Sequence, residues 1–123
     1  MKDERPTHKE LTKRIKVASE TVLEGKLEIV NHSSVRDDAI ELGYSFVIEG
    51  KETILKLLRE IKPDDYIGRH PPEKVAVKNH IKGADLFAFR CNSNLFKCEV
   101  YFKFVIKDGY FYLVSLHKNR RGK

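Results

Sequence analysis

The C-terminal third of the chain constrains the fold most, because its hydrophobic residues recur at every second position. Three stretches between residues 84 and 118 have this period: ADLFAFRC, LFKCEVYFKFVIK and YFYLVSLHK. Such alternation is typical of strands with one face on a core and the other toward solvent. The connections NSN and KDG are short and suit antiparallel neighbours. The sequence therefore predicts an antiparallel three-stranded meander.

The first half of the chain has the period of helices. Thr7 begins a capping-box spacing before a run of apolar residues at helical intervals, which predicts a helix over about 8–24. A second, short helix is expected after Ser34 and should stop at Gly43, and a third is expected over about 51–61. Helices followed by strands predict an α+β fold, with N-terminal helices packed on one face of a small antiparallel sheet.

Length and composition favour one compact unit, so residues 1–123 are interpreted as a single domain. Residues 62–83 have no clear period, and so long a connection in a small domain is usually functional. No stretch approaches the roughly 20 apolar residues of a membrane span, and the N-terminus is too polar for a signal peptide. We therefore expect a cytoplasmic protein in which Cys91 and Cys98 are reduced and fill space.

Positive charge gathers in the second half of the chain. Residues 1–61 contain 11 Lys/Arg and 12 Asp/Glu, a net charge of −1, whereas residues 62–123 contain 13 and 6, a net charge of +7. A basic half beside a neutral one indicates a face that binds a polyanion, most simply RNA. A solvated lysine-rich surface is the competing interpretation.

The register of the last hairpin decides which side chains share the sheet face away from the core. A two-residue turn at Asp108 and Gly109 would pair Phe102 with Ser115 and bury polar groups. A three-residue KDG loop pairs Phe102 with Val114, and hydrophobic matching predicts this register. The outward face then carries an acid, a phenol, an ammonium, a hydroxyl and an imidazole: Glu99, Tyr101, Lys103, Ser115 and His117.

Such a face suits RNA cleavage without a metal ion. A base removes the proton of the ribose 2′-hydroxyl, an acid protonates the leaving oxygen, and cations stabilise the charge on the phosphate. His117 is suited to proton transfer as acid or base, and Tyr101 to the partner role. Lys103 and a loop arginine such as Arg69 would hold the phosphate. His and Cys spacings fit no standard zinc site, so no metal or cofactor is expected.

The order and spacing of the segments resemble the MqsR type of toxin, a member of the RelE-like group of bacterial toxin ribonucleases. The resemblance runs from about residue 5 to 119 and includes RPTHKELTKRIKV, DDAIELGYSF, DDYIGR and EVYFKFVIKDGYFYLVSLHKN. It implies a RelE-like fold and a metal-free mRNA endoribonuclease that halts translation. It also implies a cognate antitoxin protein that neutralises the enzyme.

The resemblance also implies residue roles. Tyr101 occupies the family's strand tyrosine position, and His117 stands where the MqsR type has a C-terminal lysine. Arg69 is the nearest candidate for the family's lysine after the third helix. A glutamine expected before the first strand of the meander is replaced by Ala84, so the family's sequence preference does not carry over.

The sequence thus predicts a toxin-like ribonuclease domain with four catalytic residues: His117, Tyr101, Arg69 and Lys103. Further RNA contacts are expected from Lys78, His80, Lys118, Arg120 and Arg121. The expected partners are mRNA and the antitoxin, with no membrane and with a homodimer as an open alternative. Two other functions stay open: a non-catalytic RNA-binding module that uses the same face, and a protein-interaction domain that presents its basic surface to an acidic partner.

Overall fold

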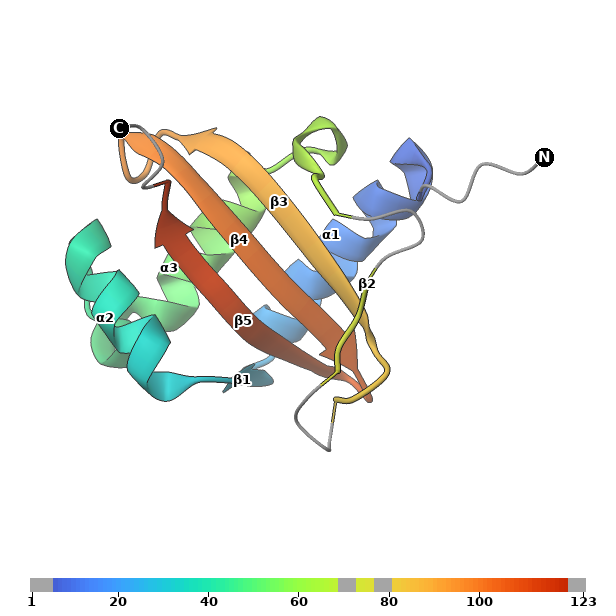
Figure 1. Cartoon of the computed structure of the whole chain (residues 1–123), viewed down its shortest axis with the longest axis horizontal. Coiled ribbons are helices and arrows are strands. Elements are labelled where there is room, and N and C mark those ends of the chain that lie inside the picture. Colours follow the sequence, from blue (N-terminus) through green and yellow to red (C-terminus); the bar gives the residue numbers. More distant parts are fainter. Residues whose placement is uncertain (1–5, 69–72, 77–80, 120–123) are drawn as a thin grey trace.

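The computed structural model describes residues 6–68, 73–76 and 81–119. The elements in chain order are α1 (His8–Leu23), β1 (Leu27–Ile29), α2 (His32–Leu42), α3 (Phe46–Glu60), the 3₁₀ helix η1 (Pro63–Asp65), β2 (Glu73–Lys74), β3 (Asp85–Ser93), β4 (Cys98–Lys107) and β5 (Tyr110–Lys118). The strands form a sheet in the order β1-β5-β4-β3-β2. Helices α1 and α3 lie behind this sheet, and α2 packs beside β5 (Figure 1). The predicted α+β fold is confirmed.

The start of α1 is where the sequence predicts it. The Thr7 hydroxyl accepts the Glu10 N–H at 3.0 Å, and the Glu10 carboxylate accepts the Thr7 N–H at 2.7 Å. This reciprocal capping box satisfies two of the N–H groups that a helix start leaves without partners. The end at Leu23 also agrees with the prediction.

Helices α2 and α3 begin earlier than predicted. Asn31 caps α2 by accepting the Ser34 N–H at 3.0 Å, so Ser34 lies inside the helix. Ser45 caps α3, which therefore includes Gly50. A Cβ atom at Gly50 would lie 2.9 Å from the Phe46 ring, so this glycine makes room for a side chain one turn earlier. The predicted end of α2 at Gly43 is confirmed.

The core lies between the helices and one face of the sheet. Phe104 of β4 is at its centre, with its ring stacked on Phe89 of β3 at 5.8 Å and on Phe111 of β5 at 5.0 Å between centroids. All three rings are fully buried. Leu11 of α1 and Leu57 of α3 close the core from the helical side. Among the described residues, no helix combines the length and apolar character needed to cross a bilayer.

The sheet is mixed, whereas the sequence predicted an antiparallel one. The meander β3-β4-β5 is antiparallel as expected. Strand β1, however, pairs with β5 in parallel, with Leu27 opposite Phe111. A parallel neighbour is joined through a crossover connection, here the long stretch from α2 to β4, and a local alternation pattern does not reveal such a pairing.

The predicted register of the β4–β5 hairpin is wrong along its whole length, by one residue next to the turn and by two residues from Lys103 onward. Lys107 pairs with Tyr110, which leaves a two-residue turn of Asp108 (φ 53°) and Gly109 (φ 79°). Two left-handed residues are the mark of a type I′ turn, whose twist matches that of the flanking strands. The predicted pairing of Phe102 with Val114 does not form.

A β-bulge in β5 allows the two-residue turn to form without burying the polar side chains of β5 in the core. Phe104 pairs with Leu113 and Lys103 pairs with Ser115, so Val114 is the extra residue of the bulged strand. The bulge shifts the alternation of β5 by one position and keeps polar residues out of the core. The core side chains of β5 are Phe111, Leu113 and Leu116.

The opposite face of the sheet is partly covered. Val105 alternates with Phe104 along β4 and therefore points away from the main core, yet it is fully buried. Ile81 is also fully buried outside the main core cluster, and Ala88 of β3 is only 7% exposed. The end of this face that carries Tyr101 is more accessible, since Tyr101 is only half-buried.

Glu60 ties the end of α3 to the β3–β4 turn. Its carboxylate accepts the Ser93 hydroxyl at 2.6 Å and the Leu95 N–H at 2.9 Å. Because Ser93 is only 4% exposed, its hydroxyl has little access to water once this partner is removed.

We expect Glu60→Ala to lower the free energy of unfolding by about 2 kcal/mol, because it leaves two donors without their charged acceptor. Denaturant titration measures this loss. The matched control is Glu52→Ala on the exposed face of the same helix, for which a change within about 0.5 kcal/mol is expected. Equal losses in both variants would contradict the assigned role of Glu60.

Candidate functional site

Tyr101 of β4 and His117 of β5 lie directly opposite each other on the sheet face away from the core. Their ring centroids are 5.4 Å apart and the ring planes meet at 82°, an edge-to-face contact. Both side chains are half-buried. The three-residue loop would have put His117 opposite Glu99, so the bulge brings the two proton-transfer candidates closer than the sequence predicted.

The backbone orients the His117 ring. Its Nδ1 atom lies 3.0 Å from the carbonyl oxygen of Lys118. A carbonyl oxygen only accepts hydrogen bonds, so Nδ1 carries the proton in this contact. In the neutral ring Nε2 then has the lone pair, and it is the atom that can accept a proton from a substrate.

Lys103 and Ser115 form the next outward pair along the same two strands. Outward positions on one strand are about 7 Å apart, so the Lys103 ammonium lies within reach of a phosphate placed over Tyr101. Lys103 is half-buried and lies opposite Ala88 of β3 on its other side. The outward set that the sequence predicted therefore shares one face of the sheet.

Glu99, the outward residue before Tyr101 on β4, has a structural role beside the Tyr101–His117 pair. Its carboxylate accepts the Asn119 side-chain amide and lies 3.7 Å from Nε of Arg90. The Asn119 N–H donates to the Glu99 carbonyl at 2.9 Å, which fixes the chain directly after β5. Glu99 thus holds the backbone that carries His117.

Part of the predicted site falls within the described residues. His117, Tyr101 and Lys103 are brought together, and Lys118 is exposed at the end of β5. The other predicted residues lie outside the described residues: Arg69, Lys78, His80, Arg120 and Arg121.

A hollow that the sequence did not predict lies next to Lys103. Its volume is about 190 Å³, and its lining residues are Ile67, Gly68, Glu73, Leu86, Ala88 and Lys103. They come from β3, β4 and two pieces of the irregular connection. The only signal for it in the sequence was the length of that connection, which already indicated a function.

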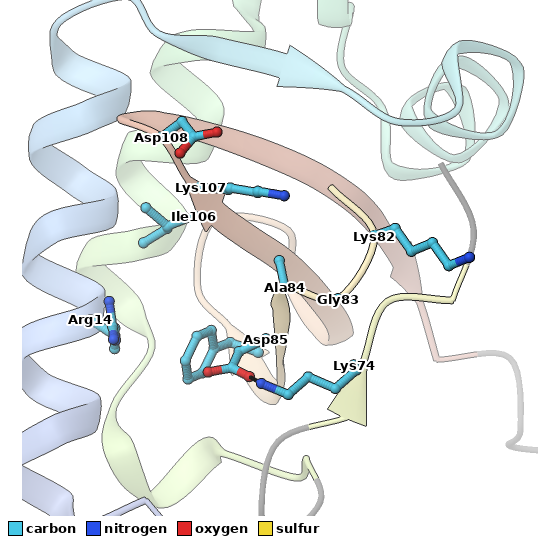
Figure 2. Close-up of a pocket in the computed structure, with 10 residues that line it drawn as sticks. Arg14, Lys74, Lys82, Gly83, Ala84, Asp85, Ile106, Lys107 and Asp108 are labelled. Carbon is cyan, nitrogen blue, oxygen red and sulfur yellow. Dashed lines mark hydrogen bonds and ion pairs between the residues drawn. The ribbon is translucent and has the colours of Figure 1, made fainter. Parts of the chain in front are cut away.

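A larger cleft of about 390 Å³ lies at the turn end of the sheet, between α1 and the segment before β3 (Figure 2). Its charged lining residues are Arg14, Lys74, Lys82, Asp85, Lys107 and Asp108. Lys74 is paired with Asp85, and the Arg14 guanidinium lies 5.8 Å from the centroid of the Phe87 ring. The described lining has a net positive charge, and it includes none of the four predicted site residues that the structure describes, which are Tyr101, Lys103, His117 and Lys118.

The two cysteines are unpaired and lie away from this face. Cys91 is only 7% exposed and belongs to the core cluster, against which Cys98 packs. Burial, with smaller contributions from Asp65, Glu60 and Glu99, raises the pKa of the Cys91 thiol to about 11. The predicted space-filling role of Cys91 agrees with this environment. Among the described residues, no group of three or more His, Cys, Asp or Glu side chains is arranged to hold a metal ion.

In a Cys98→Ser variant, we expect native Cys91 to resist alkylation near neutral pH. With a pKa of about 11, the thiolate is roughly one part in a thousand at about pH 8, and the thiolate is the reacting form. The rate should rise about tenfold per pH unit until the pH approaches the pKa, as long as the protein stays folded. Mass spectrometry after iodoacetamide treatment measures the reaction, with denatured protein as control. Equally rapid labelling of native and denatured protein would contradict the raised pKa of the Cys91 thiol in the folded protein.

Compared with known proteins, the sequence matches no protein-family model and no curated protein.

Proposed function

We propose that the protein is a metal-free mRNA endoribonuclease of the RelE-like toxin group, the toxin of a toxin–antitoxin system. The observation that carries the proposal is the direct pairing of Tyr101 with His117 on the open sheet face. Lys103 is the next outward residue on the same strand. A base and an acid at paired positions, with a cation about 7 Å along the strand, are the groups that RNA cleavage needs.

The geometry supports one assignment of roles. Nε2 of His117 takes the proton of the ribose 2′-hydroxyl, and the 2′-oxygen attacks the phosphorus. The bond to the 5′-oxygen breaks, and that oxygen receives the Tyr101 hydroxyl proton. Lys103 stabilises the negative charge on the phosphate in the transition state. The products are a 2′,3′-cyclic phosphate and a 5′-hydroxyl, and a proton returned from His117 to Tyr101 resets the site.

The sequence supports the substrate and the biological role. The net charge of +7 on residues 62–123 suits a polyanion, and the resemblance to the MqsR type of toxin suggests mRNA in the cytoplasm. Roles for Arg69 and for the other basic residues outside the described ranges stay predictions.

A partner protein is part of the proposal. Three large apolar side chains on α2 and α3 are exposed: Ile40 (71%), Val47 (94%) and Ile48 (83%). Ile40 and Val47 line the same hollow, and exposed apolar groups that lie together are typical of surfaces that another protein covers. An antitoxin or a second copy of the chain would meet this requirement.

We expect the purified protein to cut a long single-stranded RNA in the presence of EDTA. His117→Ala and Tyr101→Phe should each lower the cleavage rate at least 100-fold, because each removes one proton-transfer group. Gel analysis measures the rate, and the cyclic phosphate end identifies the chemistry.

The matched controls replace the same residue types elsewhere. His32→Ala on α2 and Tyr110→Phe at the turn end of β5 should leave the rate within about twofold, because both residues are exposed and neither lies beside the pair, since Tyr110 is opposite Lys107 at the turn. Full activity of His117→Ala would exclude its assigned role.

The basic cleft of Figure 2 favours a second candidate, a non-catalytic RNA-binding module, because it is separate from the Tyr101–His117 pair. On this alternative, RNA is retained at low salt and stays uncut.

The cleft also yields a binding prediction that holds for either candidate. We expect Lys82→Glu with Lys107→Glu to weaken RNA binding and to reduce the slope of log affinity against log salt by about 0.7 for each phosphate that is no longer neutralised. Fluorescence anisotropy at several salt concentrations measures the slope. The control reverses two exposed lysines of α3, Lys51 and Lys56, neither of which lines the cleft. An unchanged slope in the cleft variant would show that RNA does not use the cleft.

A further inference from the structure

The hollow beside Lys103 lies on the same sheet face as the Tyr101–His117 pair. Lys103 forms one wall of it, and Ala88, directly opposite Lys103 on β3, forms part of the floor. Tyr101 is the next outward residue before Lys103 on β4, about 7 Å away. A ligand that fills this hollow therefore reaches the position proposed for the scissile phosphate.

The floor and one side of the hollow are apolar. Leu86 and Ala88 point outward from β3, because they alternate with the core residues Phe87 and Phe89. Ile67 lies along the same strand, since its N–H donates to the Ala88 carbonyl at 2.9 Å. A hollow of about 190 Å³ with such a floor suits a single flat ring better than an extended chain.

Among the described lining residues, Glu73 supplies the one acidic group. It pairs with Leu86 through the backbone of β2, and its side chain is exposed. Within the described part of the chain, its carboxylate has no hydrogen-bond or ion-pair partner, and the neighbouring Lys74 pairs with Asp85 instead. An ionised carboxylate only accepts hydrogen bonds, so it selects ligands that present N–H donors.

We propose that this hollow binds the base of the nucleotide next to the scissile phosphate, and that Glu73 favours bases with an amino group over uracil. The proposal rests on the RNA binding proposed above and specifies which base that site accepts. The apolar floor would contact the flat face of the base, and Lys103 would hold the adjoining phosphate. Glu73 would then accept a hydrogen bond from the amino group.

A comparison of cytosine with uracil distinguishes recognition by Glu73 from unspecific stacking, because the two rings have nearly the same size. Cytosine presents an N4 amino donor, which carboxylates accept, where uracil presents an O4 carbonyl. A carboxylate facing that carbonyl gains no hydrogen bond and is repelled by the oxygen. A well-placed pairing of this kind discriminates by about 1–3 kcal/mol.

The test uses 2′-O-methyl oligocytidine and oligouridine of equal length, which keep the ribose but cannot be cut. Fluorescence anisotropy at one salt concentration gives the two dissociation constants. We expect the wild type to bind the cytidine strand about tenfold more tightly, which corresponds to about 1.4 kcal/mol. In Glu73→Gln the preference should fall to about twofold or less, because an amide can turn to donate or to accept.

Glu28→Gln is the matched control, since Glu28 is an exposed glutamate of β1 and its substitution removes the same charge from another strand. This variant should keep the tenfold preference. Equal binding of both strands by the wild type, or the same loss of preference in Glu28→Gln, would overturn the base pocket. RNA cleavage that persists with equal binding would overturn only this inference. Absence of both binding and cleavage would overturn the proposed function as well.

Discussion

The β-bulge at Val114 is the constraint on which both faces of the sheet depend. The type I′ turn at Asp108 and Gly109 fixes one register near the hairpin end, and continued unchanged it would place Ser115 opposite Phe102. One extra residue in β5 shifts the phase, so that Leu116 enters the core and His117 turns outward. The same shift sets His117 opposite Tyr101. Core packing and the proposed chemistry are therefore consequences of one local irregularity.

The aromatic core makes this register hard to change. Phe102 and Phe104 of β4 are fully buried, and Phe104 stacks on rings of both neighbouring strands. Each such side chain contributes roughly 1.5–3 kcal/mol through burial. A slip by one residue would expose these rings and bury Lys103, so it is strongly disfavoured. Groups held on such strands are positioned more rigidly than groups on loops, which is what proton transfer over short distances requires.

The sequence predicted those features that depend on local pattern. The helix after Thr7, the three strands of the meander and the outward set around Tyr101 all follow from capping or alternation. Features without such a local pattern were missed. Ser45 caps α3 while its own N–H bonds to Glu49, four residues away, so the usual three-residue spacing is absent. Likewise, the parallel pairing of β1, the phase shift at Val114 and the hollow beside Lys103 arise only when separate segments meet.

The hollow shows why base preference is harder to predict than the position of the reacting groups. Tyr101 and His117 belong to paired strands, whose alternation is visible in the sequence. Glu73 and Ile67 reach the site because two short pieces of an irregular connection run along β3. In the proposed enzyme, the paired strands position the reacting groups, whereas the irregular connection supplies the residues that select the base. A substitution at Glu73 can therefore change the preferred sequence without disturbing the register, since its exposed side chain makes no contact on which the core depends.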